Sequence, residues 1–411
     1  MLIFLQLVCT IVFAANTSNL NPTKLKNFPF DSALQSTLSG TVIAPSINMK
    51  KYNLRLRNDR SEVFPFEGEE RIPVQSLIRH PEMPLFILIP GLGGNAASTN
   101  LKNIAAMVSQ LGYNVLTLPN AFHYQFVLGF SENVLPGYAP RDAAEYYDFL
   151  KMVVSRIERH EGIRFPKYYL AGVSLGALHS AFLSKIDAEK QDFQFEKVFL
   201  FNPPIDLDYS LNALDDFYAA GQIYTKRQQD YLRGKMIQAI TEIPDVNNSS
   251  DLIAYIKKQI DLPEPALKWL IGDSFRDSLT WIIYYSQQIK DLGILQEPIY
   301  RYRRNGRINE AAAFSYQDYL QDFVYRDLKK TGPLLPVDEL LKRSSLFSLE
   351  ETLKNNSHIF LIHSLDDIIV TPSHLEWAQN VFGKRMTLFD KGGHLGAIWT
   401  NEFRHHFLRR L

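Results

Sequence analysis

One serine in the sequence stands in a short motif that suits a catalytic nucleophile. Ser174 lies between Gly172 and Gly176 in the order Gly-Val-Ser-Leu-Gly. A nucleophilic serine projects its hydroxyl from a sharp, strained strand-to-helix turn, and glycines on both sides remove steric clashes there. An apolar run at 168–171 precedes the motif, and a helical pattern at 177–184 follows it. The sequence therefore predicts Ser174 as a nucleophile on such a turn.

A serine hydroxyl needs a general base before it can attack at neutral pH. His394 stands in Gly-Gly-His-Leu-Gly, after an expected strand at 385–390 and before an expected helix at 396–410. A loop in that position can bring an imidazole over the sheet edge to which the serine points. We therefore predict His394 as the base. His363, at the end of another expected strand, is expected close to the site in a supporting role.

The imidazole in turn needs a carboxylate that holds one tautomer and balances its developing charge. Asp366 and Asp367 follow the expected strand 359–363. Asp367 begins the sequence Asp-Ile-Ile-Val. This sequence is typical of the turn that carries the catalytic acid in hydrolases whose nucleophile is a serine on a strand-to-helix turn, so we favour Asp367 over Asp366. The alternative is that both are loop acids that cap the helix after Pro372. The chain order Ser, Asp, His is the order this kind of hydrolase uses.

Two backbone N–H groups are expected to bind the oxyanion that forms during acyl transfer. One belongs to Leu175, directly after the nucleophile, and the other to Leu92 in the glycine-rich loop 90–94. That loop lacks the Lys-Ser/Thr ending of a phosphate-binding P-loop and the full Gly-X-Gly-X-X-Gly spacing. No metal-binding spacing such as His-Glu-X-X-His occurs. The sequence therefore predicts neither a cofactor nor a metal.

These residues require a parallel sheet whose carboxyl edge gathers the loops. Residues 51–80 show short, partly alternating strands, and from Pro84 onward continuous apolar runs alternate with helical patterns. Such runs suit strands that helices cover on both faces. The expected strands of this second part are 85–89, 114–118, 167–173, 197–201, 358–363 and 385–390.

A helical insertion interrupts this alternation. Residues 205–346 show helical patterns and no strand-like run, so we expect a cap or lid on the α/β core. The basic cluster 300–307 inside it is expected to be a solvated turn rather than a site for an anion or a membrane. Aromatic residues of the cap either line a lipophilic pocket or, more commonly, pack between helices. They are Phe217, Tyr224, Tyr255, Trp269, Trp281, Tyr284 and Tyr285.

Composition excludes some classes of function. The 411 residues carry 44 basic and 44 acidic side chains and 46% apolar residues, which indicates a large core and no nucleic-acid partner.

An apolar run over 2–15 is too short to span a bilayer and resembles a cleaved signal peptide. Export to the periplasm or the medium is expected, with an uncleaved membrane anchor as the alternative. Cys9, the only cysteine, lies in this leader, so no disulfide is expected in the mature chain.

The expected organisation has four parts. Residues 1–15 form the leader, 16–204 and 347–411 form the two halves of the α/β core, and 205–346 form the cap. The sequence gives no oligomeric state.

From about residue 84 to the end, the insertion excepted, the chain resembles the α/β-hydrolase superfamily. The motifs around Ser174, Asp367 and His394, with Asn-Pro-Pro-Ile-Asp-Leu at 202–207, are similar to those of the YheT-like (embryogenesis-associated) esterases. The insertion and the leader depart from that group. The resemblance implies a Ser174–Asp367–His394 triad that hydrolyses a small-molecule ester or lipid. A peptidase, thioesterase or acyltransferase on the same triad is the alternative, followed by a non-catalytic binding protein.

Overall fold

The computed structural model describes residues 20–411 except 58, 61–69, 242–248, 301–302 and 332–334. The predicted leader at 1–15 lies outside the described residues. Among the helices that the structure describes, none combines the length and the apolar character that a membrane span requires.

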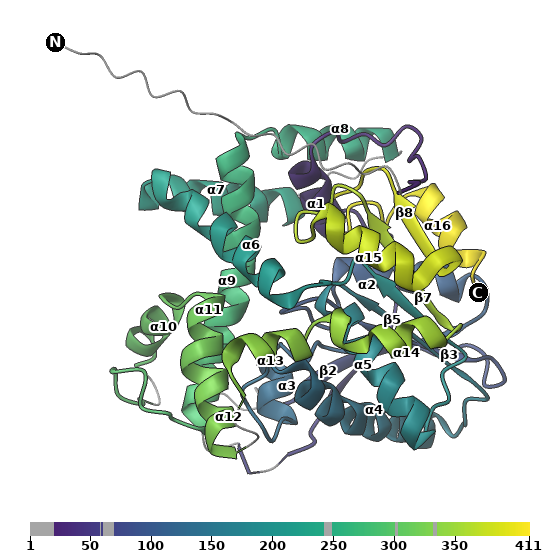
Figure 1. Cartoon of the computed structure of the whole chain (residues 1–411), viewed down its shortest axis with the longest axis horizontal. Helices are drawn as coiled ribbons and strands as arrows, with labels where there is room; N and C mark the ends of the chain where they lie inside the picture. Colours follow the sequence, from purple (N-terminus) through teal and green to yellow (C-terminus); the bar gives the residue numbers. More distant parts are fainter. Residues whose placement is uncertain (1–19, 58, 61–69, 242–248, 301–302, 332–334) are drawn as a thin grey trace.

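The core is an eight-stranded sheet in the order β1-β2-β4-β3-β5-β6-β7-β8 (Figure 1). The six strands from β4 to β8 along this order run parallel, whereas β2 pairs antiparallel with both β4 and β1. The sheet is mostly parallel, as the sequence predicts for an α/β-hydrolase fold. The strands are Lys50–Leu54 (β1), Ile72–Leu77 (β2), Leu85–Ile89 (β3), Asn114–Thr117 (β4), Tyr168–Val173 (β5), Lys197–Phe201 (β6), Ile359–Ser364 (β7) and Met386–Phe389 (β8).

Helices cover both faces of the sheet, which explains why the central strands are continuously apolar. Along β3, Leu85, Ile87 and Ile89 belong to one buried cluster, and Phe86 and Leu88 belong to another. This alternation follows from the two-residue repeat of a strand. Helices α3, α4 and α5 pack on the first face, and α1, α2 and α16 pack on the second. These helices are Ala33–Val42 (α1), Thr99–Ser109 (α2), Tyr124–Gly129 (α3), Ala139–Glu161 (α4), Leu175–Lys190 (α5) and Asn401–Leu408 (α16).

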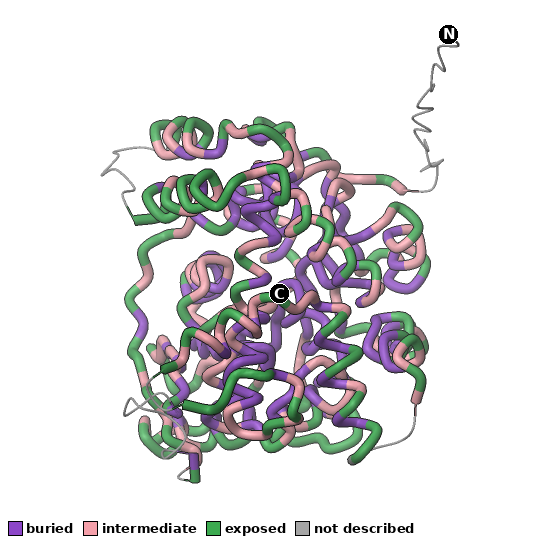
Figure 2. Tube along the Cα trace, turned by 90° about the vertical axis from the view of Figure 1, so that its left-hand side faces the viewer, coloured by how far each residue is buried: buried purple, intermediate pink, exposed green. Residues whose placement is uncertain are grey.

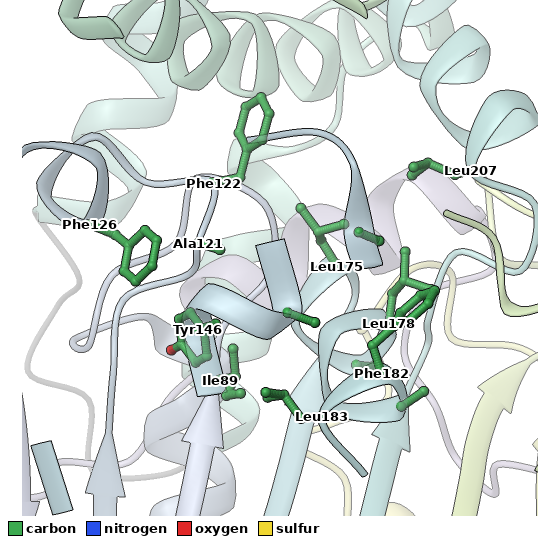
Figure 3. Packing of buried hydrophobic residues seen from close by; sticks show 14 of the residues in the cluster. Ile89, Ala121, Phe122, Phe126, Tyr146, Leu175, Leu178, Phe182, Leu183 and Leu207 are labelled. Atoms are coloured by element: carbon green, nitrogen blue, oxygen red, sulfur yellow. The ribbon is translucent and has the colours of Figure 1, made fainter. Parts of the chain in front are cut away.

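Side chains from several helices meet at the upper end of the first face. Figure 3 shows Phe126 of α3, Tyr146 of α4 and Leu183 of α5 around Ile89, the last residue of β3. All four are buried. This packing fixes the start of the loop after β3 relative to the helix that follows the serine.

The described residues between β6 and β7 form helices only. α9 is the long central helix of this region and packs closely against α6, with Gly272 of α9 against the backbone of Tyr218. Figure 2 shows buried residues concentrated inside the molecule and exposed residues along the outer helical turns. The helices are Leu207–Ala219 (α6), Ala220–Ile223 (η1), Lys226–Thr241 (α7), Ser249–Gln259 (α8), Glu264–Ile289 (α9), Asn305–Ala312 (α10), Tyr316–Asp318 (α11), Tyr319–Tyr325 (η2), Arg326–Thr331 (α12), Val337–Arg343 (α13), Leu346–Leu349 (η3) and Glu350–Asn355 (α14). Pro372–Phe382 (α15) and Gly383–Arg385 (η4) lie between β7 and β8.

Two helices differ from the sequence expectation. Helix α1 was not predicted, because its serine, threonine and glycine residues are weak helix formers. Its hydroxyls bond back to carbonyls of the preceding turn, as Ser36 does to Ser32 O and Thr37 does to Ala33 O. The closing helix was expected at 396–410 but begins at Asn401, where the Thr400 side chain accepts the N–H of Phe403.

Candidate active site

Ser174 stands on the sharp turn between β5 and α5. Its φ of 52° and ψ of −124° belong to a region that residues with a side chain seldom adopt. A Cβ on Gly172 would lie 2.1 Å from Gly176 O, and one on Gly176 would lie 2.2 Å from Pro90 O. Both glycines are therefore required by close backbone approach. The N–H of Ser174 donates to Phe201 O at 2.8 Å, which ties the turn to the neighbouring strand.

The structure brings the three predicted residues together at the carboxyl edge of the sheet. His394 Nε2 lies 2.9 Å from Ser174 Oγ, and His394 Nδ1 lies 3.0 Å from Asp367 Oδ2 and 3.1 Å from Oδ1. All three side chains are buried. Ser174 follows β5, Asp367 follows β7 and His394 follows β8. Three loops at one edge of the sheet therefore position a continuous Ser–His–Asp chain.

Asp367 is held as an acceptor for the histidine. Asn202 Nδ2 donates to Asp367 Oδ2 at 2.8 Å, and the N–H of Ile369 donates to Oδ1 at 3.1 Å. Burial raises the pKa of this carboxyl, but the neighbouring His394 and His363 and the Asn202 amide outweigh burial and keep the pKa below its ordinary value. Asp367 is therefore a carboxylate at neutral pH. Asn202 belongs to the Asn-Pro-Pro-Ile-Asp-Leu motif, but the sequence does not reveal its contact with Asp367.

Asp366 has a different position from Asp367. Its Oδ1 accepts the N–H of Gly393 at 2.8 Å, so it holds the backbone of the histidine loop instead of the imidazole. Its pKa is raised, chiefly by burial. The adjacent acids thus divide two tasks: Asp367 contacts His394, and Asp366 contacts the loop that carries it.

His363 packs behind the acid, fully buried. Its Nδ1 accepts the N–H of Ser364 at 3.0 Å, and its Nε2 lies 3.3 Å from Pro203 O, to which it donates. Burial lowers the pKa of His363, so the ring is neutral at pH 7. His363 Nδ1 lies 3.6 Å from Asp367 Oδ2.

Helix α1 supports the histidine loop from the other side, which the sequence did not reveal. Thr37 Oγ1 accepts the N–H of His394 at 2.9 Å. A Cβ on Gly393 would lie 2.2 Å from Ala33 O, and one on Gly40 would lie 2.7 Å from Leu395 O. The glycines allow α1 to lie directly on the loop. The recurring glycines around His394 were the available signal, but nothing in the sequence named their partner.

Both predicted oxyanion donors lie beside the serine. Leu175 is the first residue of α5, a position at which the helix supplies no acceptor for the N–H. The Leu92 N–H has no hydrogen-bond partner within the described part of the chain. The loop that carries it is fixed by Asn120, whose Nδ2 donates to Pro90 O at 2.7 Å. A Cβ on Gly91 would lie 3.1 Å from the Ser174 Cβ, so the loop approaches the nucleophile closely.

A cavity of about 270 Å³ opens onto Ser174 and His394. Its walls come from three parts of the chain: α1, the loop after β3 with the start of α2, and α9. The residues of α9 that line it are Ile271, Ser274, Phe275 and Ser278. None of the seven cap aromatics named from the sequence lines this cavity. Trp269, Tyr284 and Tyr285 are instead buried between helices.

Within the described residues, no group of three or more histidine, cysteine or acidic side chains is arranged to hold a metal ion.

No family model and no curated protein matches the chain. Solved structures with a similar fold include an esterase from Pyrococcus furiosus, with 12% identity over 95% of this chain and 96% of that one, at a TM-score of 0.40. Another is 2-hydroxy-6-oxo-6-phenylhexa-2,4-dienoate hydrolase from Rhodococcus sp. strain RHA1, with 14% identity over 88% of this chain and 98% of that one, at a TM-score of 0.44. A third is naproxen esterase from Bacillus subtilis, with 13% identity over 92% of this chain and 96% of that one, at a TM-score of 0.43. At these values the likeness assigns no activity to this chain.

Proposed function

We propose that the protein is a serine hydrolase that cleaves carboxylic esters through an acyl-enzyme. The observation that carries this proposal is the continuous hydrogen-bonded chain from Ser174 through His394 to Asp367. A nucleophile, a base in contact with it and a carboxylate that orients the base are the three groups that acyl transfer requires. Each of them is buried at the end of a different strand, where the backbone holds it.

In the first half of the reaction, His394 Nε2 takes the proton from Ser174 Oγ as the oxygen attacks the ester carbonyl carbon. The tetrahedral oxyanion accepts hydrogen bonds from the N–H groups of Leu92 and Leu175. When it collapses, the bond from carbon to the alcohol oxygen breaks, and His394 returns the proton to that oxygen. An alcohol leaves, and the acyl group stays on Ser174.

In the second half, water takes the place of the alcohol. His394 removes a proton from the water, whose oxygen attacks the acyl carbon, and the proton then passes to Ser174 Oγ as the acid departs. Asp367 remains ionised throughout. It keeps the proton of the neutral imidazole on Nδ1 and stabilises the imidazolium in both halves.

The helical region between β6 and β7 has the role of a cap in this proposal, because α9 forms one wall of the cavity at Ser174. Membership of the YheT-like esterases remains a prediction from the motifs alone. Export likewise remains a prediction from the apolar run at 2–15, and the N-terminal residue of the protein recovered from culture medium or periplasm would test it.

A fluorophosphonate probe tests the nucleophile. The folded protein should be labelled, and Ser174→Ala should not. Equal labelling of the two proteins, or no labelling of the folded wild type, would exclude Ser174 as the nucleophile.

A panel of p-nitrophenyl esters of graded chain length, compared with thioester and aminopeptidase substrates, tests the reaction class. Faster turnover of the thioester or amide substrates than of every ester would contradict the ester assignment.

A further inference from the structure

A second cavity, of about 540 Å³, lies farther from Ser174 and is built largely from cap helices. In Figure 1, α7 lies beside α9. The residues that line the cavity belong to these two helices and to α1, α6 and α10. We call it the α7 groove. Its apolar lining residues are Leu38, Tyr218, Met236, Ile237, Ile240, Leu270, Ile308 and Ala312.

The α7 groove adjoins the catalytic cavity. Leu38 and Thr41 of α1 and Ser274 of α9 line both of them. The catalytic cavity alone, at about 270 Å³, is smaller than most ligand sites, which span roughly 300–1,000 Å³. The combined volume of the two cavities falls within that range. Leu38, Thr41 and Ser274 therefore lie at the boundary between the catalytic cavity and the α7 groove.

Both arginines that line the groove are paired with carboxylates, whereas the lining Asp277 has no ion pair among the described residues. Arg233 binds Asp273 through two hydrogen bonds of 2.5 and 2.6 Å, and Arg276 donates to Asp215 at 2.8 Å. The Arg276 guanidinium also lies 4.3 Å from the ring centre of Tyr218. A bidentate pair of this kind leaves little capacity to bind a further anion. The groove is therefore suited to a neutral, apolar ligand rather than to a phosphate or carboxylate.

The wall formed by α7 exposes apolar side chains to solvent. Ile237 is 62% exposed and Ile240 is 48% exposed, although both line the groove. An apolar ligand that covers these side chains removes apolar surface from water, which favours binding. Exposed apolar side chains at the mouth of a cavity are typical of a ligand-binding groove.

We propose that the α7 groove binds a long, neutral apolar chain of the ester substrate, while the ester group lies at Ser174. The preferred substrates are then long-chain esters of the lipid class. This inference deepens the proposed function and depends on it for the reaction, but not for the binding of the chain. The chain belongs either to the acid or to the alcohol of the ester, and both share the chemistry that the groove recognises.

The test compares Ile237→Asp and Ile240→Asp with Ile223→Asp. Ile223 is the matched control, because it is 69% exposed on the same cap and lines neither cavity. We expect kcat/KM for p-nitrophenyl dodecanoate or for dodecyl acetate to fall about tenfold in the two groove variants, since a carboxylate at either position loses water when an apolar chain covers it. p-Nitrophenyl acetate turnover should stay within about twofold of wild type, and Ile223→Asp should change neither. The long substrate that responds identifies the half of the ester that the groove holds.

The binding step is measured separately in Ser174→Ala, which retains the groove. A fluorescent long-chain acyl ester should bind this protein, and Ile237→Asp in that background should weaken binding about tenfold. Equal losses for acetate and dodecanoate, or the same loss in Ile223→Asp, would overturn the groove assignment. If no ester is turned over but the long chain still binds and the groove variants weaken it, the proposed reaction fails and the groove assignment stands.

Discussion

The carboxyl edge of the sheet and the helices between β6 and β7 meet at the same cavity, but their side chains differ in burial and in hydrogen bonding. At the edge, Ser174, His394 and Asp367 are buried and hydrogen-bonded to one another, and further groups fix the loops behind them. On the helical side, Ile237 and Ile240 are exposed beside a cavity larger than the one at the serine.

This difference separates chemistry from recognition. Proton transfer and oxyanion binding need donors and acceptors fixed before the substrate arrives, because reorganisation during the reaction costs rate. A chain-binding surface needs only apolar area and room, because the hydrophobic effect has no direction. The edge should therefore tolerate almost no change of a polar atom, and the helical side should respond mainly to changes in volume or charge.

Asp367→Asn should have the largest effect, because it alters the edge without changing its shape. An amide at this position favours the wrong imidazole tautomer, and kcat for p-nitrophenyl acetate should fall about 10⁴-fold with the fold intact. The matched control is Asp366→Asn, whose amide oxygen still accepts the Gly393 N–H. We expect this control to lose less than about tenfold, since it removes only part of one hydrogen bond. If Asp366→Asn is the more damaging change, the division of tasks between the two acids is wrong.

The boundary between the two regions contains a buried titratable side chain, Asp142, whose pKa reports on how tightly the regions are packed. Asp142 of α4 is buried, accepts the Gly137 N–H at 2.6 Å and lines a small cavity with Tyr319 and Leu320 of the helical region. Burial raises its pKa to about 7, against opposing contributions from Arg141 and the Gly137 N–H and with a small one in the same direction from Glu145. The folded protein therefore holds a proton that the unfolded chain has already lost above about pH 4.

The sign of the pH effect follows from that proton. Between about pH 4 and pH 7 the unfolded state binds fewer protons at Asp142, so this residue lowers stability progressively as pH rises, by a few kcal/mol in total. Asp142→Asn cannot ionise and should lack this contribution. Its free energy of unfolding should increase relative to that of the wild type as pH rises from 5 to 7.5, as measured by urea titrations. A constant difference between the two proteins over that range would show that Asp142 is already ionised in the fold.

On the helical side, a change in volume should have an effect of intermediate size. A Cβ on Gly272 of α9 would lie 2.2 Å from the backbone N of Tyr218, so Gly272→Ala must push α9 away from α6. We expect a loss of about 1–3 kcal/mol in the free energy of unfolding. Gly234→Ala is the control, because nothing lies within 4 Å of that Cβ and alanine favours the helix. A Gly272→Ala protein with unchanged stability and unchanged long-ester activity would mean that α9 can move away from α6 without loss of folding free energy or activity.

The sequence revealed the catalytic edge better than it revealed the surroundings of the edge. The continuous apolar run of β3 and the glycines around Ser174 are local signals with one physical explanation each, and the structure has the strand and the turn where they were expected. Helix α1 left no such signal, because it forms through contacts with a loop more than 350 residues away, such as the Thr37 bond to His394. The α7 groove was missed for a related reason, since its lining comes from five helices whose spacing no local pattern encodes.

Helix α1 touches both regions, and it offers the subtlest test of the comparison. Thr37 lines the catalytic cavity and accepts the His394 N–H at 2.9 Å, so it positions the base without contacting the reacting atoms. Thr37→Val keeps the shape but removes the acceptor, which should cost about 1 kcal/mol, or roughly fivefold in kcat, as the loop loses its preferred position. KM for p-nitrophenyl acetate should not change, and Thr37→Ser should restore kcat because its hydroxyl can accept the same N–H. If KM for p-nitrophenyl acetate rises while kcat is preserved, or if Thr37→Ser does not restore kcat, Thr37 belongs to the substrate-binding wall and not to the catalytic edge.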